Sequence, residues 1–463
     1  HANFWRNSDD YGLKRRVMVV NCNKIRVRNL SLSNTTVGVE LWKTTDSEII
    51  DNTISNEDYG IELYKSSNNT ITNNNVSNSI YGIRLEDSCN NNTITNNSAT
   101  NNGYGIGLDK SSNNTIANNS ATNNGYGIGL DKSSNNTIAN NSATNNGYGI
   151  GLDKSSNNTI ANNSATNNGY GIGLDKSSNN TIANNNVSNN TDGILLHDSN
   201  NNIITNNNAN SNNYYGIELY NSSNNTITNN ANSNNYYGGI WLYYSCNNTI
   251  VNNNVLNNLF GIFLRGSSNN TIAKNNANSN NFYGIFSSDS STNNKIYLNN
   301  FINNTDNVYS YNSNNIWNST EKITYTYNGS EFEGYLGNYW DDYKERYPEA
   351  EEIDECGIWD TPYSIDSDAD NHPLVKPWEN YFELPENIFD TGVPVNPYPS
   401  ISGTHNGTIK PNHTVIATKL YTYPCEGTGG HTEYARIWNK TWNATATWEG
   451  YASDWHNISF DKP

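Results

Sequence analysis

The sequence reads SATNNGYGIGLDKSSNNTIANN four times in succession, from Ser98 to Asn185, without a substitution. Identical units need identical surroundings, and a solenoid supplies them because each unit touches only the unit before it and the unit after it. Related but less regular units continue the pattern on both sides. We therefore expect one stacked rod through most of the chain.

One apolar column runs through these units with a spacing of 22–24 residues: Ile25, Ile49, Ile71, Ile94, Ile116, Ile138, Ile160, Ile182, Ile204, Ile227, Ile250, Ile272 and Ile296. A Gly-Ile-X-Leu signature follows later in each unit. The alternation of β-branched and polar residues predicts short strands that face a core on one side. Helix-forming residues are scarce, which disfavours helical and leucine-rich repeats. The predicted fold is an all-β parallel β-helix of about 13 turns.

The composition shifts along the chain and suggests four segments. Residues 1–20 form an N-terminal cap or an incomplete first turn, and residues 21–320 form the β-helix. Residues 321–393 form a C-terminal cap. Residues 394–463 read as short antiparallel strands with Gly and Pro turns, and we expect a β-sandwich-like module that is truncated at Pro463.

The net charge of -18 argues against nucleic acid as a partner, because a polyanion repels phosphate backbones. No stretch is apolar enough to span a bilayer. Asn-X-Ser/Thr sequons are frequent and include candidate glycosylation sites at Asn118, Asn140 and Asn162. The chain starts at His1 without a signal-peptide pattern. We expect a processed or incomplete piece of a larger extracellular or cell-surface protein.

Two polar or aromatic columns accompany the isoleucine column. An asparagine follows each column isoleucine by three residues, and in the identical units these are Asn97, Asn119, Asn141, Asn163 and Asn185. Stacked amides can hydrogen-bond along a rod, as in other cross-β stacks. A tyrosine precedes most Gly-Ile pairs and predicts an aromatic stack: Tyr59, Tyr81, Tyr104, Tyr126, Tyr148 and Tyr170. We interpret both columns as structural.

Three blocks follow near the end of the rod: GNYWDDY at residues 337–343, DTPY at residues 360–363 and DNHPLVKPW at residues 370–378. Together with the repeats over residues 20–380, they resemble the right-handed parallel β-helix repeats of the NosD-like family, which includes cell-surface proteins of methanogenic archaea. The resemblance implies a right-handed coil with this C-terminal ending. Residues 351–359 depart from the Asp/Asn/Gly-rich loop that the family carries between the blocks.

The residue after each Gly-Ile-X-Leu leucine points outward and forms the first candidate binding surface. In the identical units it is an aspartate followed by a lysine, which gives a charge ladder of Asp109, Asp131, Asp153 and Asp175 with Lys110, Lys132, Lys154 and Lys176. Aspartates at one-turn spacing repel each other by about 1 kcal/mol in water and by more at lower dielectric. Neutralisation by the lysines is the favoured interpretation. The alternatives are a row of bound calcium ions or a basic partner.

The second candidate surface is aromatic. Trp241, Phe263 and Phe286 project from the neighbouring outward column, beside Tyr220 and Tyr243. An exposed aromatic strip along a solenoid is a platform for sugar rings or for a partner protein. The alternative is that a loop or an adjacent subunit covers the strip.

Two further sites are candidates. Asp366, Asp368 and Asp370 alternate like the start of a calcium loop, although the Gly and Glu of an EF-hand are missing, and a solvated acidic turn is the favoured interpretation. No cofactor is expected, and calcium is the one candidate. Cys356 and Cys425 are the one plausible disulfide pair. Cys22, Cys89 and Cys246 lie turns apart, too far for a disulfide, and are predicted to be small buried thiols, with Cys89 and Cys246 at the second serine of a Ser-Ser corner.

The favoured function is a non-catalytic extracellular structural protein, either a rigid spacer or a self-assembling unit of a surface layer or filament. Exposed rod ends would invite stacking unless they are capped. Expected partners are copies of the chain or other surface proteins, and polysaccharide. The alternative function is a carbohydrate-binding β-helix module.

An enzyme and a copper-handling protein are less favoured. Asp192 lies in NTDGI (residues 190–194), which resembles the first catalytic block of polygalacturonases, but the other motifs of that family are absent. Copper handling, implied by some NosD-type proteins, needs Met, Cys or His ligands. The chain has one Met, and His405, His413, His431 and His456 are scattered over the terminal module. Identical repeats leave little room for a unique site, so we expect the chemistry outside them.

Overall fold

The computed structural model describes the backbone of residues 2–3, 6–7, 14–366 and 368–382, together with four strands between residues 419 and 459. Side chains are described from residue 16 to residue 382 except at residue 367, and at residues 436, 438 and 445. The chain divides into two compact units, residues 1–384 and residues 385–463. The predicted module boundary at residue 394 lies outside the described residues.

A turn of the first unit contains one six-residue strand and two three-residue strands. In the turn that starts in the first identical unit, these strands are β16 (Tyr104–Asp109), β17 (Thr115–Ala117) and β18 (Ser120–Thr122). Each strand pairs in parallel with its equivalent one turn later, so that Tyr104 lies opposite Tyr126 and Thr115 lies opposite Thr137. The predicted parallel β-helix is therefore confirmed, with about 14 turns in place of 13.

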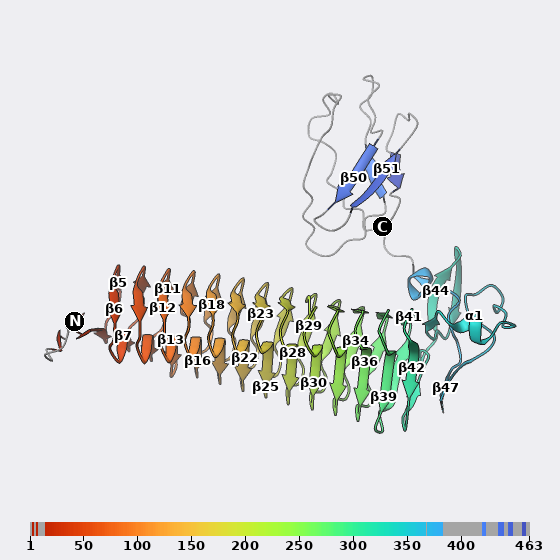
Figure 1. Ribbon diagram of the computed structural model, residues 1–463, viewed down its shortest axis with the longest axis horizontal. Helices are drawn as coiled ribbons and strands as arrows, with labels where there is room; N and C mark the ends of the chain where they lie inside the picture. Colours follow the sequence, from red (N-terminus) through yellow and green to blue (C-terminus); the bar gives the residue numbers. More distant parts are fainter. Residues whose placement is uncertain are drawn as a thin grey trace, which may run out of the picture. The chain divides into compact units, whose positions relative to one another are not determined.

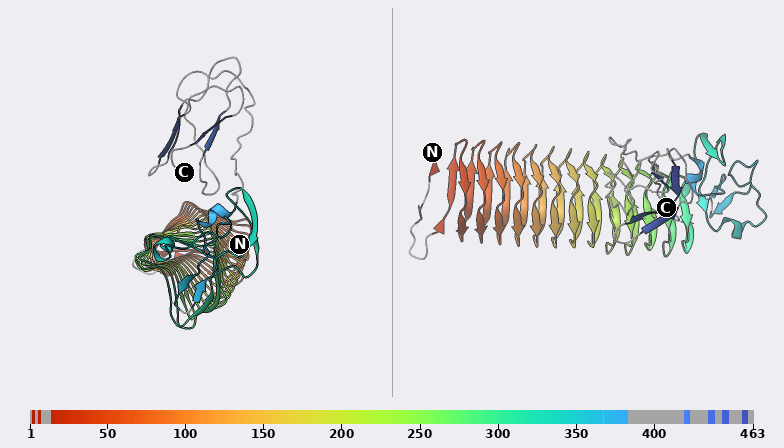
Figure 2. Two further views of the ribbon diagram at one scale, coloured as in Figure 1. Left: turned by 90° about the vertical axis from the view of Figure 1, so that its right-hand side faces the viewer. Right: turned by 90° about the horizontal axis from the view of Figure 1, so that it is seen from above.

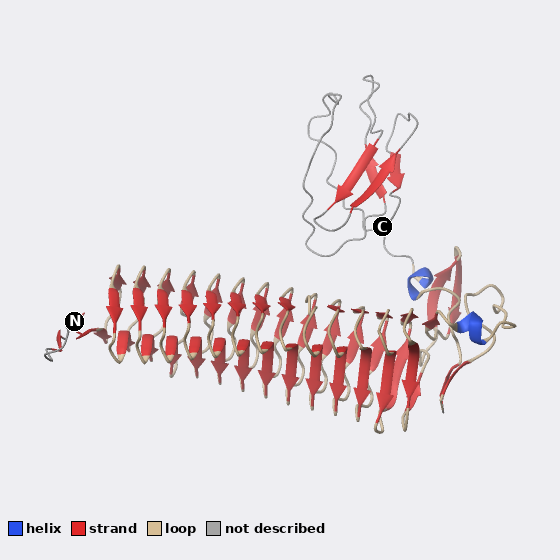
Figure 3. Ribbon diagram, in the orientation of Figure 1, coloured by secondary structure: helices blue, strands red, loops and turns tan. Residues whose placement is uncertain are grey.

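The stacked strands form three long parallel faces along the rod (Figure 1; Figure 3). The first sheet, which carries the long strands, has 15 strands, and the second sheet has 14. The third face consists of an eight-stranded and a five-stranded sheet, which isolated bridges at Asn208 connect. Seen end-on, the turns of the rod lie over one another (Figure 2).

The long strands of the first sheet position the candidate site. They are β4 (Val17–Val20), β7 (Val37–Trp42), β10 (Tyr59–Tyr64), β13 (Tyr81–Glu86), β16, β19 (Tyr126–Asp131), β22 (Tyr148–Asp153), β25 (Tyr170–Asp175), β28 (Asp192–His197), β30 (Tyr215–Tyr220), β33 (Gly238–Tyr243), β36 (Phe260–Arg265), β39 (Tyr283–Ser288) and β42 (Asp306–Ser310). The short β1 (Ala2–Asn3) pairs antiparallel with β4.

Three corners of an identical turn are Asn-Asn pairs, in which the first residue is exposed and the second is buried, and the fourth is a Lys-Ser pair. The first asparagine, such as Asn118, is exposed and has a positive φ of 57°. Among residues with a Cβ, asparagine adopts this left-handed conformation most readily. The second asparagine, such as Asn119, is buried. The dipeptide thus bends the chain and then returns a polar side chain to the interior.

The buried asparagines form the predicted ladder. Asn119 Oδ1 accepts hydrogen bonds from the Asn97 backbone N–H at 2.9 Å and from Asn97 Nδ2 at 3.0 Å. Asn119 Nδ2 in turn donates to Asn141 Oδ1 at 3.0 Å and to the Ile94 carbonyl at 2.9 Å. Every amide therefore satisfies backbone groups that the bend would leave unpaired in the core.

The structure contains two more asparagine ladders that the sequence reading missed, and one serine ladder. One follows the Ser-Ser corner and includes Asn92, Asn114, Asn136 and Asn158, and the other lies at the third corner and includes Asn102, Asn124, Asn146 and Asn168. The serine ladder includes Ser111, Ser133, Ser155 and Ser177. Cys89 belongs to this ladder at the first serine position, not the second as predicted. Cys89 is buried as expected, whereas Cys22 and Cys246 are partly exposed.

The three sequence blocks near residues 337–378 cap the C-terminal end of the rod. The ladder passes from Asn299 to Asn338 at 2.9 Å. The fully buried Asp370 then accepts hydrogen bonds from the Asn338 N–H at 2.7 Å and from Trp340 Nε1 at 3.0 Å. Burial raises the pKa of Asp370 to about 7. The Trp340 ring stacks on Tyr363 at 4.3 Å between centroids.

The cap contains the three aspartates of the candidate calcium loop, and calcium binding there stays a prediction. Asp366 and Asp368 flank the turn between β47 (Tyr363–Ile365) and β48 (Asp368–Asp370), and each accepts a backbone N–H from the last turn, those of Ser310 at 2.8 Å and Asn315 at 2.9 Å. The three carboxylates do not form a convergent metal-ligand group among the described residues. Their oxygens serve as hydrogen-bond acceptors because the rod ends here with unpaired donors.

The remaining elements are small. The cap also contains the antiparallel pair β44 (Ile323–Tyr327) and β45 (Ser330–Gly334), the helix α1 (Tyr343–Arg346) and the 3-10 helix η1 (Trp378–Tyr381). The second unit has two antiparallel pairs, β49 (Lys419–Thr422) with β52 (His456–Ser459) and β50 (Tyr434–Trp438) with β51 (Asn443–Thr447). No helix in the described part of the chain is long and apolar enough to cross a membrane.

We predict that Asn141→Ala destabilises the rod strongly. It leaves the Asn119 N–H and the Ile116 carbonyl without their amide partners in the interior. An unsatisfied buried polar group costs about 1–3 kcal/mol, so the free energy of unfolding should fall by at least about 2 kcal/mol in urea denaturation. Asn140→Gly, at the exposed corner position next to it, should cost less than about 0.5 kcal/mol. Equal losses in the two variants would contradict the ladder.

Candidate functional site

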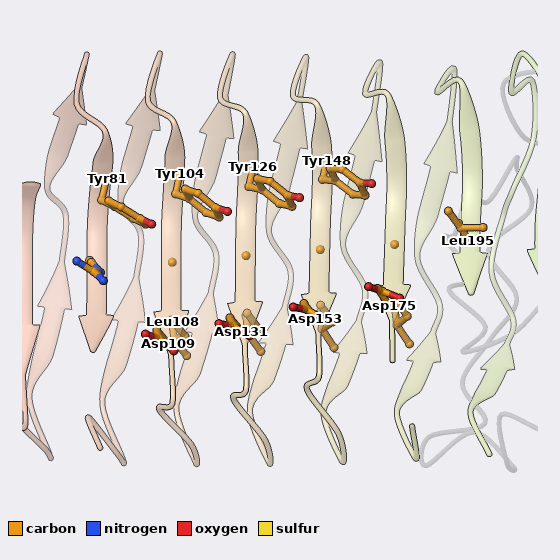
Figure 4. Close-up of a pocket in the computed structure, with 18 of the residues that line it drawn as sticks. Tyr81, Tyr104, Leu108, Asp109, Tyr126, Asp131, Tyr148, Asp153, Asp175 and Leu195 are labelled. Carbon is orange, nitrogen blue, oxygen red and sulfur yellow. The ribbon is translucent and has the colours of Figure 1, made fainter. Parts of the chain in front are cut away.

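The outward face of the first sheet carries a groove along the rod, with a volume of about 540 Å³ (Figure 4). We call it the glycine groove. One wall is the tyrosine column, the floor is the centre column, and the other wall is the aspartate column. Its lining includes Tyr81, Tyr104, Tyr126 and Tyr148, then Arg84, Gly107, Gly129, Gly151, Gly173 and Leu195, and then Asp109, Asp131, Asp153, Asp175 and His197.

The glycine floor exists because of the tyrosine wall. Each tyrosine ring leans over the glycine of the next turn, and a Cβ on Gly129 would lie 3.0 Å from the Tyr104 ring. The rings stack in parallel with centroids 4.7 Å apart from Tyr104 to Tyr126 and from Tyr126 to Tyr148. The ring faces therefore cover one another. Their edges and hydroxyls remain available to line the groove. These hydroxyls form no hydrogen bond to other described residues.

Aspartates of this wall form ion pairs with the adjacent lysines, and the calcium and basic-partner alternatives stay predictions. Asp131 pairs with Lys132 and Asp153 pairs with Lys154, each at 3.1 Å. These pairs are about half exposed, and such pairs contribute little to stability. In Asp109, Asp131 and Asp153 the Oδ1 atom is shielded and accepts no hydrogen bond from a described residue. The lysines do not line the groove, so its surface remains acidic.

Arg84 closes the N-terminal end of the groove. Its guanidinium lies over the Tyr81 ring at 4.7 Å and over the Tyr59 ring at 5.1 Å. It also contacts Glu86 at 3.1 Å and Glu62 at 3.6 Å. Burial raises the pKa of Glu62, and the charge of Arg84 opposes that rise.

The C-terminal end is different, because the repeat breaks there. Asp192 replaces the tyrosine that follows Tyr170, and Leu195 replaces the floor glycine. In the next turn Glu218 occupies the floor position opposite Leu195. His197 ends the aspartate column, and its Nδ1 lies 2.8 Å from Asp175 Oδ1. We call Asp175, Asp192, His197 and Glu218 the end cluster.

Both acids that break the repeat have a raised pKa. Burial raises the pKa of Asp192 to about 6, and its Oδ1 is shielded with no hydrogen-bond partner among the described residues. Burial also raises the pKa of Glu218 to about 7, and the charge of Asp192 adds to that rise. Sequence reading noted Asp192 and missed Glu218. The signal was present in the repeat, since both positions hold a carboxylate where the identical units hold Tyr and Gly.

The predicted aromatic strip forms a stack but is less exposed than expected. Trp241 stacks on Phe263 at 3.5 Å and Phe263 stacks on Phe286 at 4.5 Å. Phe263 is buried because its neighbours cover both of its faces. Tyr220 stacks on His197 and on Tyr243, each at 5.1 Å. The sequence reading missed more exposed aromatic residues at corners of the same turns, namely Tyr214, Tyr236, Tyr244 and Phe282.

The predicted glycosylation sites and the predicted disulfide both stay predictions. Asn118, Asn140 and Asn162 are exposed at the corner between the second and third faces, away from the groove sheet, and glycosylation there stays a prediction. Cys356 is partly exposed, but Cys425 lies outside the described residues, so the disulfide also stays a prediction.

A family model described as periplasmic copper-binding protein (NosD) matches residues 19–192, 142–259 and 186–345. The chain belongs to the NosD family. No curated protein sequence matches the chain.

Solved structures with a similar chain path include enzymes that act on carbohydrates. The mannuronan C-5 epimerase AlgE6 A-module of Azotobacter vinelandii has 17% identity and a TM-score of 0.48, and the match covers 63% of this chain and 89% of that chain. The periplasmic alginate epimerase AlgG has 15% identity and a TM-score of 0.36, covering 61% and 77%. DFA-IIIase from Arthrobacter chlorophenolicus A6 has 12% identity and a TM-score of 0.33, covering 46% and 56%. At such scores the likeness says nothing about the site.

The described residues do not fit a copper site. The one group of convergent ligand atoms among them is Asp175, His197 and Asp198, which offers a single imidazole. Copper(I) prefers Met and Cys, and copper(II) prefers several imidazoles. Burial raises the pKa of the Cys89 thiol to about 11, which opposes the thiolate form that a metal binds. The four C-terminal histidines lie outside the described side chains.

We predict that Glu218→Gln stabilises the protein at pH 8 and leaves its stability unchanged at pH 4. Because the folded-state pKa is raised from 4.5 to about 7, wild-type stability is highest below pH 4.5 and falls as the pH rises to about 7. At about 1.4 kcal/mol per pKa unit, the gain at pH 8 is roughly 3 kcal/mol.

Thermal unfolding at the two pH values measures this effect. Glu331→Gln, at an exposed position of the cap, is the control and should change stability at neither pH. A Glu218→Gln variant that is no more stable than wild type at pH 8 would show that the carboxylate is not held in an unfavourable environment.

Proposed function

We propose that this chain is an extracellular structural rod that binds a linear neutral polysaccharide along its glycine groove. One observation carries the proposal. Four consecutive turns offer the same set of groups, a tyrosine hydroxyl, a glycine floor and a carboxylate. The spacing of these sets is the strand separation of about 4.8 Å.

A periodic site favours a periodic ligand. A small molecule would use one or two of the four identical turns, whereas an extended polymer that lies along the rod can use all of them. The length of one sugar ring in an extended glycan is close to the spacing of the turns. Avidity then accumulates from weak, repeated contacts.

The chemistry of the walls favours a carbohydrate. The tyrosine hydroxyls have no protein partner among the described residues, and they can both donate and accept. The carboxylates of Asp131 and Asp153 line the opposite wall and accept hydrogen bonds. Sugar hydroxyls supply matching donors and acceptors on both edges of a chain.

The charge of the groove favours a neutral glycan. Four aspartates line it, and its two basic lining residues already have acidic partners: Arg84 contacts two glutamates, and His197 contacts Asp175. The chain as a whole has a net charge of -18. An anionic polysaccharide would be repelled along its whole length.

The extracellular assignment draws on other support. The family description refers to a periplasmic protein, and the candidate glycosylation sites are exposed at a corner away from the groove. Self-association stays a prediction. The packed cap leaves the C-terminal end of the rod unsuited to end-to-end stacking, so any assembly would use other surfaces.

We predict that Tyr126→Phe with Tyr148→Phe weakens glycan binding without loss of stability. Each change removes one hydroxyl that contacts no described protein group. A hydrogen bond contributes about 1 kcal/mol, so two should weaken binding by about 10-fold or more. The binding assay is affinity electrophoresis or calorimetry with xylan, glucomannan, mixed-linkage glucan and amylose.

The matched control is Tyr236→Phe, which removes the hydroxyl of a tyrosine that is 72% exposed outside the groove. It should bind like wild type. The proposal is wrong if no neutral glycan of the panel binds, or if the groove variant and the control lose affinity equally.

A further inference from the structure

We propose that the end cluster is a catalytic site that hydrolyses a glycosidic bond of the glycan held in the groove, with Glu218 as the acid and His197 as the base. The inference rests on the proposed function, because the groove is what brings the glycan to the cluster. The proposed catalytic residues lie where the sequence of the identical units is interrupted.

At the break in the repeat, residues that stabilise the rod are replaced by buried carboxylates that destabilise it. The preceding turns hold a stacked tyrosine and a glycine, and the end cluster holds Asp192 and Glu218 in the same columns. Buried carboxylates without a cationic partner cost stability. Glu62 in the same column has Arg84 as a partner at 3.6 Å, while Glu218 forms no ion pair among the described residues. Such local cost is typical of functional sites.

The location links the cluster to the groove. Leu195 and His197 are the last residues of the groove lining, and both belong to β28. Glu218 lies in the floor column one turn further on, opposite Leu195. A chain that leaves the glycine floor at Leu195 therefore has His197 beside it and Glu218 next along the floor column.

His197 is oriented for proton transfer. Its Nδ1 lies 2.8 Å from Asp175 Oδ1, and its ring stacks on Tyr220 at 5.1 Å. With the Nδ1 proton donated to Asp175, the lone pair of Nε2 is available to accept a proton. Asp175 is therefore a positioning residue.

Glu218 is held as a proton donor. Asp192, Tyr170, Tyr215 and His197 are the titratable groups that act on it, and Leu195 and Trp241 are its neighbours in the column. Asp192 is 7% exposed with one unpartnered oxygen, and its negative charge favours the protonated form of Glu218. Asp192 acts through Glu218 and is a second positioning residue.

The spacing suits a hydrolysis. Glu218 lies opposite Leu195, and His197 is two residues further along the same strand. Diagonal positions on neighbouring strands place the two residues, measured at the backbone, about 7–8 Å apart. In inverting glycosidases the two carboxyl groups are about 6.5–9.5 Å apart, which leaves room for the water molecule, and the Glu218–His197 pair is proposed to leave a similar gap.

The reaction balances with water as the co-reactant. Glu218 gives its proton to the glycosidic oxygen as the bond from that oxygen to the anomeric carbon breaks. His197 Nε2 takes a proton from a water molecule as the water oxygen bonds to the anomeric carbon. Two shorter chains result, one with a new reducing end, and solvent returns the proton from His197 to Glu218.

The experiment measures reducing ends released from the four neutral glycans by the full chain, with mass spectrometry of products formed in ¹⁸O-labelled water. Glu218→Gln and His197→Gln should each lower the rate at least about 100-fold, as expected for loss of a general acid or base. Both variants should still bind the glycan. Glu40→Gln is the control, since Glu40 occupies the same column near the other end and burial also raises its pKa.

The pH profile tests the positioning role of Asp192. Wild-type activity should fall as the pH rises through about 7, where Glu218 loses its proton. Asp192→Asn should move this fall to lower pH, because the charge that favours the protonated acid is gone. A purely structural role of Asp192 would leave the position of the fall unchanged.

The outcomes separate the two proposals. A glycan that binds but yields no labelled reducing ends overturns the catalytic inference and leaves the proposed function intact. Release that Glu40→Gln reduces as much as Glu218→Gln does also overturns it. Absence of binding by every glycan of the panel overturns both.

Discussion

The hydrogen bond from one buried asparagine amide to the next is the interaction on which the rest of the structure depends. The chain has few apolar residues for its length, and its core is a few aliphatic columns wide. The amide ladders extend that core by pairing the backbone groups of every corner with the turn above and the turn below. In the ladder that contains Asn119, each amide donates to the amide of the next turn towards the C-terminal end, and Asp370 supplies the final acceptor. An amide chain of this kind fixes the register because a shifted turn would leave buried polar groups unpaired.

Because the register is fixed, the sequence repeat produces a regular surface along the rod. Since each residue lies directly opposite its equivalent, tyrosines meet tyrosines and glycines meet glycines, and the groove between the two walls follows from that alignment (Figure 4). The repeat thus provides a uniform groove in which a polymer can lie. The places where it is interrupted, at Arg84 and at Leu195, define where the groove begins and ends.

Much of the fold was readable from the sequence, and the site was readable only in part. The isoleucine period, the Asn97–Asn185 ladder and the tyrosine stack depend on spacing alone, so alignment of the units predicts them. The other ladders were missed because Asn-Asn pairs look like loops until the conformation of the first residue is known. The identical units were expected to lack chemistry, yet they line the groove, since a groove depends on how far Tyr104 leans over Gly129. Phe263 was expected to be exposed, and ring stacking buries it. Asp370 was expected in a solvated acidic turn, but it is buried, because its partners Asn338 and Trp340 lie some 30 residues away in the sequence.

A crystal structure of the full chain with a neutral oligosaccharide of six to eight sugars, chosen from the glycan that binds best, tests the central claim most directly. We predict an extended sugar chain in the glycine groove, parallel to the rod, with one sugar for each turn and its hydroxyls on Tyr126, Tyr148, Asp131 and Asp153. A sugar chain that instead lies on the exposed aromatic corner around Tyr236, or that crosses the rod, would contradict it.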